Sequence, residues 1–333
     1  MVTVQQSRPV GGLCCSCGGN AAGRFKARGA FQISPGSTML GGFDLEVFML
    51  TRRRFTALSA ATAAALALPL KMRGAATRSG LDFGLVLYTV RKNLTDLPAM
   101  LELIHQIGYA SIEVFQQVYD HPAAELKVLI ESHGLTAPSG HFDYATIADK
   151  VEYASALGLK YMICPVIPRD LWDTADGFKK AAAHLNEAAA KIGAAGMTLG
   201  YHAHNYEYKP LPDGTTGFAV LMKELDPAIK LELDIYWATQ AGQDPLKLMR
   251  ENRKRLALIH IKDRKAGSPT GYMSGPAGAH FTEVGSGTID WKAVIGEAHK
   301  LGVKQMFVEQ DTQEIPAEES IRKSFEYLAK LQL

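Results

Sequence analysis

The sequence predicts an α/β protein folded as a closed (β/α)8 TIM barrel, and three observations lead to this. Eight short apolar segments of strand character alternate with eight segments of helical period from residue 80 onward. Several of the helical segments end at a glycine just before the next strand, where helices commonly stop. The segment after the first strand, "LYTVRKNL", is not a glycine-rich phosphate loop, which disfavours an open doubly wound sheet. Strict alternation of strands and helices is typical of a parallel barrel.

The expected elements follow one repeating order. The strands are Phe83–Tyr88, Ser111–Phe115, Leu135–Ser139, Tyr161–Val166, Thr198–Ala203, Lys230–Asp234, Leu256–Ile261 and Gln305–Glu309. The helices are 94–108, 123–134, 146–158, 177–196, 217–226, 244–255, 290–302 and 317–331. We see no linker inside 80–333, so we expect one domain, of about the length that such barrels use.

The segment before the barrel has the features of an export signal. "MLTRRRFTALSAATAAALALPL", Met49–Leu70, has a basic start and then an Ala/Leu-rich apolar run, and Gly74, Ala75 and Ala76 offer a small-residue cleavage site. This order predicts a signal peptide over 49–76. Because Thr51–Phe55 resembles the twin-arginine consensus, we expect Tat export to the periplasm or outside the cell. A plain amphipathic helix and an uncleaved anchor are the alternatives.

Residues 1–48 precede a signal that should itself be N-terminal. We interpret them as a disordered leader or as a mis-assigned start, with translation beginning at Met49. Cys14, Cys15 and Cys17 lie in this segment, but no second Cys/His pair stands at ligand spacing, so we do not predict a metal site there.

The distribution of charged residues indicates which kinds of molecule the protein binds. Residues 1–76 hold nine of the 36 basic residues but only two of the 34 acidic ones, so the barrel segment carries an acidic excess. A nucleic-acid-binding domain normally presents a basic face. We therefore expect a small-molecule partner, no nucleic acid and no membrane contact in the mature form. A homo-oligomer is possible, and the sequence does not determine the oligomeric state.

Polar side chains gather where the predicted strands end. In a barrel of this kind the site forms at the C-terminal ends of the strands. The residues there are Tyr88, Glu113, His141, Asp143, Arg169, His202, His204, Glu207, Asp234, Tyr236, Trp237, His260, Lys262, Asp263, Glu309, Gln310 and Asp311. Each has a structural alternative: Glu113 as an ion-pair partner inside the barrel, for example, or Asp263 and Arg264 as a solvated loop pair. The coincidence of Asp234, His260 and Glu309 on late strands favours a functional site.

Carboxylates and imidazoles from neighbouring strands suit a divalent cation. Since no thiolate is available at these strand ends, manganese, magnesium, cobalt or zinc fits better than a soft metal. Such a metal could polarise a carbonyl and stabilise an enediolate, while a nearby carboxylate, histidine or lysine moves the proton.

Six motifs together resemble the xylose isomerase-like barrel superfamily, which includes the sugar phosphate isomerases/epimerases. They are "IEVF" (112–115), "GYHAHNYEY" (200–208), "LELDIYWATQAG" (231–242), "LIHIKDR" (258–264), "VGSGTIDW" (284–291) and "FVEQD" (307–311). The resemblance implies a divalent metal, with manganese favoured, held by Asp234, His260 and Glu309. The family's first glutamate falls on His202, so we expect His202 as the fourth ligand.

The resemblance also suggests roles for the other strand-end residues. We expect Glu309, Glu207, Lys262 and His204 to be the catalytic groups, with Glu207 over the substrate and Lys262 pointing inward as an electrophile or acid. The expected substrate-binding residues are Glu113, His141, Trp237, Tyr88 and Arg264. Trp237, which stands where the family has a histidine, could stack on a sugar face.

Four functions remain open at this point. The first is a metal-dependent isomerase or epimerase that removes a proton next to the carbonyl of a sugar or keto-sugar. The alternative is a 3-keto-glycoside lyase or hydratase on the same barrel, because the loss of one family glutamate puts symmetric epimerisation in doubt. An endonuclease-like protein and a non-catalytic sugar-binding protein are weaker alternatives.

Overall fold

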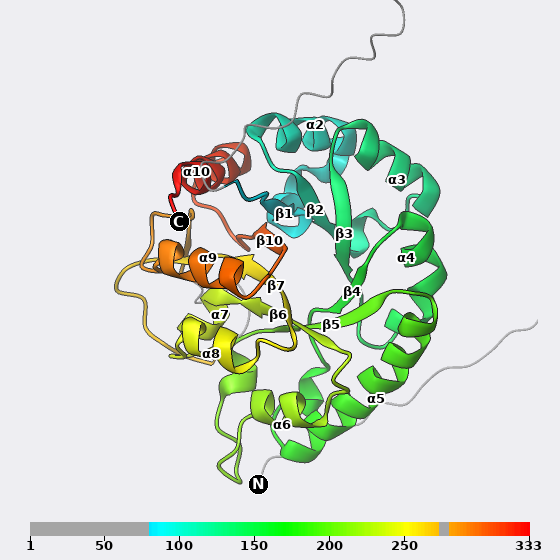
Figure 1. Cartoon of the computed structure of the whole chain (residues 1–333), viewed down its shortest axis with the longest axis vertical. Helices are drawn as coiled ribbons and strands as arrows, with labels where there is room; N and C mark the ends of the chain where they lie inside the picture. Colours follow the sequence, from blue (N-terminus) through cyan, green and yellow to red (C-terminus); the bar gives the residue numbers. More distant parts are fainter. Residues whose placement is uncertain (1–79, 273–279) are drawn as a thin grey trace, which may run out of the picture. The chain divides into compact units, whose positions relative to one another are not determined.

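The computed structural model describes residues 80–272 and 280–333, which contain a closed barrel of eight parallel strands surrounded by helices (Figure 1). Around the barrel the strands follow the order β1, β10, β7, β6, β5, β4, β3, β2. Their bounds are Gly84–Val86 (β1), Ser111–Val114 (β2), Thr136–His141 (β3), Tyr161–Cys164 (β4), Thr198–Ala203 (β5), Lys230–Asp234 (β6), Leu256–Ile261 (β7) and Gln305–Val308 (β10). The predicted (β/α)8 barrel is confirmed.

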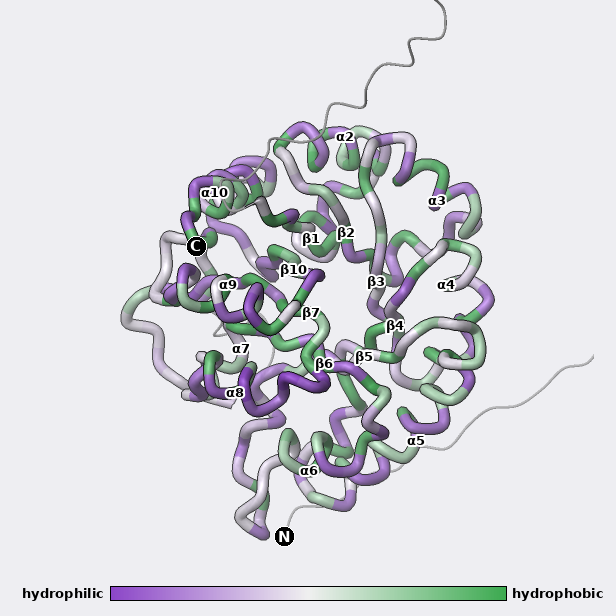
Figure 2. The backbone as a smooth tube through the Cα atoms, in the orientation of Figure 1, coloured by the Kyte–Doolittle hydropathy of each residue, from purple (hydrophilic) through white to green (hydrophobic). Residues whose placement is uncertain are grey.

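Helices connect the strands and cover the outside of the barrel. Their bounds are Leu97–Ile107 (α2), Ala123–Ser132 (α3), Val151–Leu157 (α4), Ala175–Ala194 (α5), Gly217–Glu224 (α6), Pro245–Glu251 (α8), Trp291–Lys300 (α9) and Ala317–Lys330 (α10). Hydrophobic and hydrophilic residues alternate along them (Figure 2), as expected of helices with one apolar face against the strands. The sequence did not predict the short helix α7, Ile235–Gln240, which follows β6 directly because the Asp234 side chain caps it by accepting the Trp237 N–H at 2.8 Å.

The interior of the barrel is divided into an apolar and a polar layer. Val86, Ile163, Leu258 and Phe307 form an apolar cluster inside it. Because successive side chains of a strand point to opposite faces, His260 and Lys262 follow Leu258 on the inward face of β7. Both are at most 1% exposed. The strands therefore carry an apolar layer first and polar groups toward their C-terminal ends.

Asp263 ties the chain after β7 to the segment before α9. The chain forms a two-stranded antiparallel sheet there, β8 (Asp263–Arg264) with β9 (Phe281–Thr282). The buried carboxylate accepts the N–H groups of Gly285 at 2.9 Å, Gly287 at 3.1 Å and Ile289 at 3.3 Å. A Cβ on Gly287 would lie 2.2 Å from Asp263 Oδ1, which explains the glycine in the "VGSGTIDW" motif.

Replacing Asp263 with alanine should destabilise the barrel. The change leaves three partly buried hydrogen bonds without their acceptor, and we expect the free energy of unfolding to fall by about 3 kcal/mol. Urea denaturation followed by circular dichroism measures it. The control Asp149→Ala, at an exposed position, should change the value by less than about 0.5 kcal/mol. Equal stabilities of the two variants would show that this carboxylate does not hold the segment.

The structure does not test the two predictions made for the N-terminal segments. The leader over 1–48 and the export signal over 49–76 lie outside the described residues and stay predictions. Within residues 80–272 and 280–333, no helix is both long enough and apolar enough to cross a membrane.

Candidate active site

A cavity of about 320 Å³ lies at the C-terminal ends of the strands. Seven of the residues predicted for the site line it: Tyr88, His141, His202, His204, Trp237, Lys262 and Glu309. The strand-end argument therefore brings together groups that are up to 221 positions apart in the chain. The cavity is also lined by Asp311, a predicted strand-end residue without an assigned role, and by Phe115, Gln116, Pro165, Val166, Trp172 and Tyr206.

Aromatic rings form much of the cavity wall. Trp172 and Tyr206 stack with ring centroids 3.5 Å apart and an interplanar angle of 4°. Tyr88 and Phe115 meet edge to face at 5.5 Å. Rings of this kind present large, stiff apolar surfaces to a ligand. Trp172 follows Arg169 in the segment after β4, and the prediction included Arg169 but not Trp172.

Lys262 holds its ammonium among three carboxylates. Its Nζ lies 2.7 Å from Glu309 Oε2, 2.8 Å from Asp311 Oδ1 and 3.1 Å from Asp234 Oδ2. Burial disfavours the charged form, but these carboxylates outweigh burial and raise the pKa of Lys262 well above its ordinary value. The side chain points inward, as expected, and stays cationic.

Asp311, a predicted strand-end residue for which no role was predicted, lines the cavity. It lies two residues after Glu309, beyond the end of β10. Burial, with the charge of Glu309, raises the pKa of Asp311 to about 6, although Lys262 acts in the opposite direction. Glu309 and Asp311 thus supply two carboxylates on one side of the cavity.

Three of the four predicted metal ligands, Asp234, His260 and Glu309, lie close enough to share one cation, and the fourth, His202, faces Asp234. Asp234 Oδ2 is 3.9 Å from His202 Nε2 and 4.0 Å from His260 Nδ1, and Glu309 Oε2 is 3.0 Å from His260 Nδ1. Asp234 Oδ2 is buried and has no hydrogen-bond partner among the described residues, although it pairs with Lys262. An under-satisfied carboxylate oxygen facing two imidazoles fits a divalent cation. We call these four residues the upper set.

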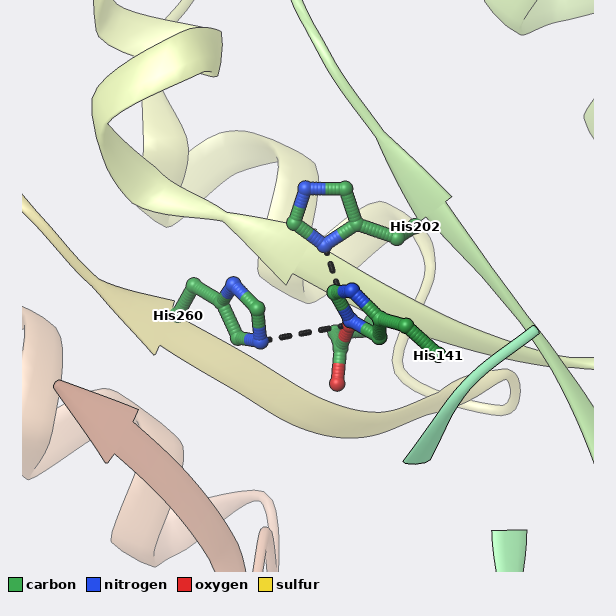
Figure 3. Close-up of side chains that lie close together, drawn as sticks. His141, His202 and His260 are labelled. Carbon is green, nitrogen blue, oxygen red and sulfur yellow. Dashed lines mark hydrogen bonds and ion pairs between the residues drawn. The ribbon is translucent and has the colours of Figure 1, made fainter. Parts of the chain in front are cut away.

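A second cluster lies beneath the upper set. His141, His202 and His260 converge there (Figure 3), each with a ring nitrogen 2.9–3.3 Å from Glu232 Oε2. These four residues, here the lower set, are all buried and could hold a metal ion, as could Asp234, His260 and Glu309. The prediction missed Glu232, which stands two residues before Asp234. The strand period, which puts both on the same face of β6, would have found it.

Glu113 joins the lower set as a buried ion-pair partner. Its Oε2 lies 2.8 Å from His260 Nε2 and 3.0 Å from His141 Nε2. It does not line the cavity, so its position fits the structural alternative better than the predicted substrate contact. Although burial lowers the pKa of His141, Glu113 and Glu232 outweigh this and raise it to about 10.

Like Glu113, the predicted metal ligands Asp234 and His260 do not line the cavity. Two further predicted site residues, Glu207 and Arg264, point away from it. The Glu207 carboxylate accepts the Tyr201 hydroxyl at 2.7 Å and the His204 N–H at 3.0 Å, so it does not lie over a substrate. The Arg264 guanidinium donates to Gln240 Oε1 at 2.7 Å and to the Ser268 carbonyl, inside the protein. In both cases the chain has already left the strand, so strand period no longer sets the direction of the side chain.

Glu207 should instead make stability depend on pH. Burial raises its pKa to about 7 from an ordinary 4.5. The folded state then binds a proton that the unfolded state releases, so stability falls as pH rises from about 4.5 to 7. Glu207→Gln should remove a loss of about 3 kcal/mol across this window. Urea denaturation at pH 5 and pH 8 measures it, with exposed Glu125→Gln as the control. Equal pH dependence in both variants would contradict this assignment.

Comparison with known proteins gives the chain its relatives. The model of the family described as "Xylose isomerase-like TIM barrel" matches residues 101–331. A solved sugar phosphate isomerase/epimerase from Parabacteroides distasonis is 26% identical, with a TM-score of 0.63 over 75% of this chain and 94% of that one. No curated protein matches.

Two more distant structures share the fold. The probable 3-DHS dehydratase AsbF from Bacillus anthracis is 11% identical, with a TM-score of 0.61 over 75% of this chain and 99% of that one. The IOLI protein, solved with a zinc atom, is 18% identical, with a TM-score of 0.59 over 74% and 96%. At these identities the likeness establishes the fold alone.

Proposed function

The chain belongs to the family of xylose isomerase-like TIM barrels, and from this premise we propose an enzyme that moves a proton next to the carbonyl of a sugar or keto-sugar. One observation carries the proposal. The cavity ends at a buried ammonium, Lys262, flanked by two cavity-lining carboxylates, Glu309 and Asp311. This arrangement places a cation next to two candidate proton acceptors, so that all three could contact neighbouring atoms of one substrate.

Each group that lines the cavity has a separate role in the proposed reaction. The Lys262 ammonium stabilises the negative charge that develops on the carbonyl oxygen when the adjacent carbon loses its proton. Glu309 or Asp311 accepts that proton and can return it. The aromatic walls hold the sugar and exclude water. His204, whose pKa is lowered well below its ordinary value by burial and by His202 and Lys262, lines the cavity as a neutral group that can hydrogen-bond a substrate oxygen.

A divalent cation fits this site. His202, Asp234, His260 and Glu309 would hold it, and it would supply Lewis acidity toward a substrate oxygen. Manganese is favoured for this oxygen-containing set, and magnesium, cobalt or zinc are the alternatives.

A second outcome, elimination from a 3-keto-glycoside, shares the first proton transfer. It is favoured by the placement of both cavity carboxylates, Glu309 and Asp311, after one strand, β10. Epimerisation with two bases needs acid/base groups on opposite faces of the carbon, and His202 stands where the family has its other glutamate. Elimination needs one base and one acid.

Product analysis separates these outcomes. The full-length protein, loaded with Mn²⁺, would be incubated with a panel of ketoses and 3-keto-glycosides and followed by NMR, with and without chelator. An epimer or aldose indicates an isomerase or epimerase, whereas a released aglycone with an unsaturated or hydrated sugar indicates the lyase or hydratase. If the metal is bound and no sugar changes, the proposal is wrong. Export to the periplasm, predicted from residues 49–76, would favour the unphosphorylated members of the panel.

A further inference from the structure

His202 and His260 belong to both donor sets through opposite ring nitrogens. His202 Nε2 and His260 Nδ1 face Asp234 in the upper set, at 3.9 and 4.0 Å from its Oδ2. His202 Nδ1 and His260 Nε2 face Glu232 in the lower set, at 2.9 and 3.3 Å from its Oε2. The two rings therefore form a layer between two possible cation positions.

The lower set has the composition and spacing of a four-coordinate site. Its third imidazole, His141, brings Nε2 to 3.2 Å from Glu232 Oε2. Zinc with bonds of about 2.0–2.1 Å in a tetrahedron holds its ligand atoms about 3.3 Å apart, and three imidazoles with one carboxylate are ligands it accepts. The four residues come from β3, β5, β6 and β7 and are at most 7% exposed. The barrel itself therefore fixes their positions.

Two buried carboxylate oxygens, one in the lower set and one beside it, lack a hydrogen-bond partner in the part of the chain that the structure describes. Glu232 Oε1 and Glu113 Oε1 make no hydrogen bond to any residue that the structure describes. The carboxylates of the upper set are already paired with the Lys262 ammonium. Among the described residues, Glu113 and Glu232 have only imidazoles as counter-charge, and buried charge is costly when it is not paired. A cation among them would balance that charge permanently.

We propose that His141, His202, Glu232 and His260 form a second divalent-metal site, selective for zinc-type cations, one layer beneath the upper set. Imidazole-rich sites suit zinc, whereas the oxygen-richer upper set suits manganese or magnesium. A neutral imidazole has one ring nitrogen free to bind a metal, so His202 and His260 cannot serve both positions at once. The chain thus binds one cation, and the identity of the cation decides which position it takes.

Zinc binding to the full-length protein tests this site without any substrate. The variant His141→Asn should bind Zn²⁺ at least about 100-fold more weakly than the parent protein. Asp234→Asn, which alters only the upper set, and His121→Asn, which replaces an exposed histidine, should bind within about three-fold of the parent. Circular dichroism of the metal-free variants checks that each is folded.

X-ray absorption of the zinc-loaded parent protein gives an answer that needs no variant. The lower set predicts three imidazoles around the metal, and the upper set predicts two. A zinc ion with only two imidazole ligands would overturn the proposed second site. So would loss of zinc binding in Asp234→Asn together with full zinc binding in His141→Asn. Failure to bind zinc would do the same. None of these results would touch the proposed sugar chemistry, which is measured with Mn²⁺.

Discussion

Replacing Lys262 with methionine should lower kcat/KM on the converted sugar by about 1000-fold. The methionine keeps the length and apolar stem of the side chain but removes the only ammonium at the end of the cavity among the described lining residues. The charge that develops on the carbonyl oxygen then loses its stabilising partner, and a loss of one such group costs two to three orders of magnitude. Steady-state kinetics on the substrate found in the panel measures it.

Stability must be separated from chemistry in this variant. Without the ammonium, Asp234, Glu309 and Asp311 face one another unpaired, and removal of one partner of a buried pair costs about 3–5 kcal/mol. The kinetics should therefore be run well below the melting temperature of the variant. Lys180→Met, at an exposed position, controls for the substitution itself. A folded Lys262→Met protein with the activity of that control would show that the ammonium takes no part in the reaction.

Asp234→Asn should abolish metal-dependent turnover, with kcat/KM lower by about 1000-fold. The asparagine oxygen can still cap α7 by accepting the Trp237 N–H, which Asp234 accepts at 2.8 Å. The anionic donor toward His202 and His260 is lost, and Lys262 loses one of its three carboxylates but keeps Glu309 and Asp311. The free energy of unfolding of the variant should therefore be measured beside its activity. Activity with increasing Mn²⁺ measures the effect, and chelator treatment of the parent protein should reproduce it.

A matched variant tests whether the loss is specific to the metal. Asp244 also caps a helix, α8, by accepting N–H groups at its start, but it is exposed and does not line the cavity. Asp244→Asn should keep full activity and full chelator sensitivity. If Asp234→Asn behaves in the same way, or if chelator leaves the parent protein active, the upper set does not bind a catalytic metal.

The sequence predicts the barrel well because buried parallel strands appear as short apolar runs. Each of the eight strands overlaps its predicted range, and the strand-end rule brings Tyr88, Lys262 and Glu309 to one cavity. The rule works because the ends of parallel strands meet at one face of the barrel.

The other features of the site depend on where loops run and where side chains point, which the sequence pattern does not determine. Trp172 comes from a loop, and the Glu207 carboxylate turns toward Tyr201, away from the cavity. The sequence did not predict Glu232 because leucines flank it in a core strand. Its charge is balanced, among the described residues, by imidazoles from β3, β5 and β7. Such compensation is visible only once the strands are placed side by side.

Solvent deuterium exchange tests the central claim most directly. The full-length protein would be loaded with Mn²⁺ in D₂O with the sugar that it converts, and the carbon next to the carbonyl would be followed by NMR. The account predicts deuterium at that carbon, lost on chelation and reduced about 1000-fold in Lys262→Met. Conversion of the sugar with no deuterium at that carbon and no solvent isotope effect would contradict proton abstraction and with it the account of this site.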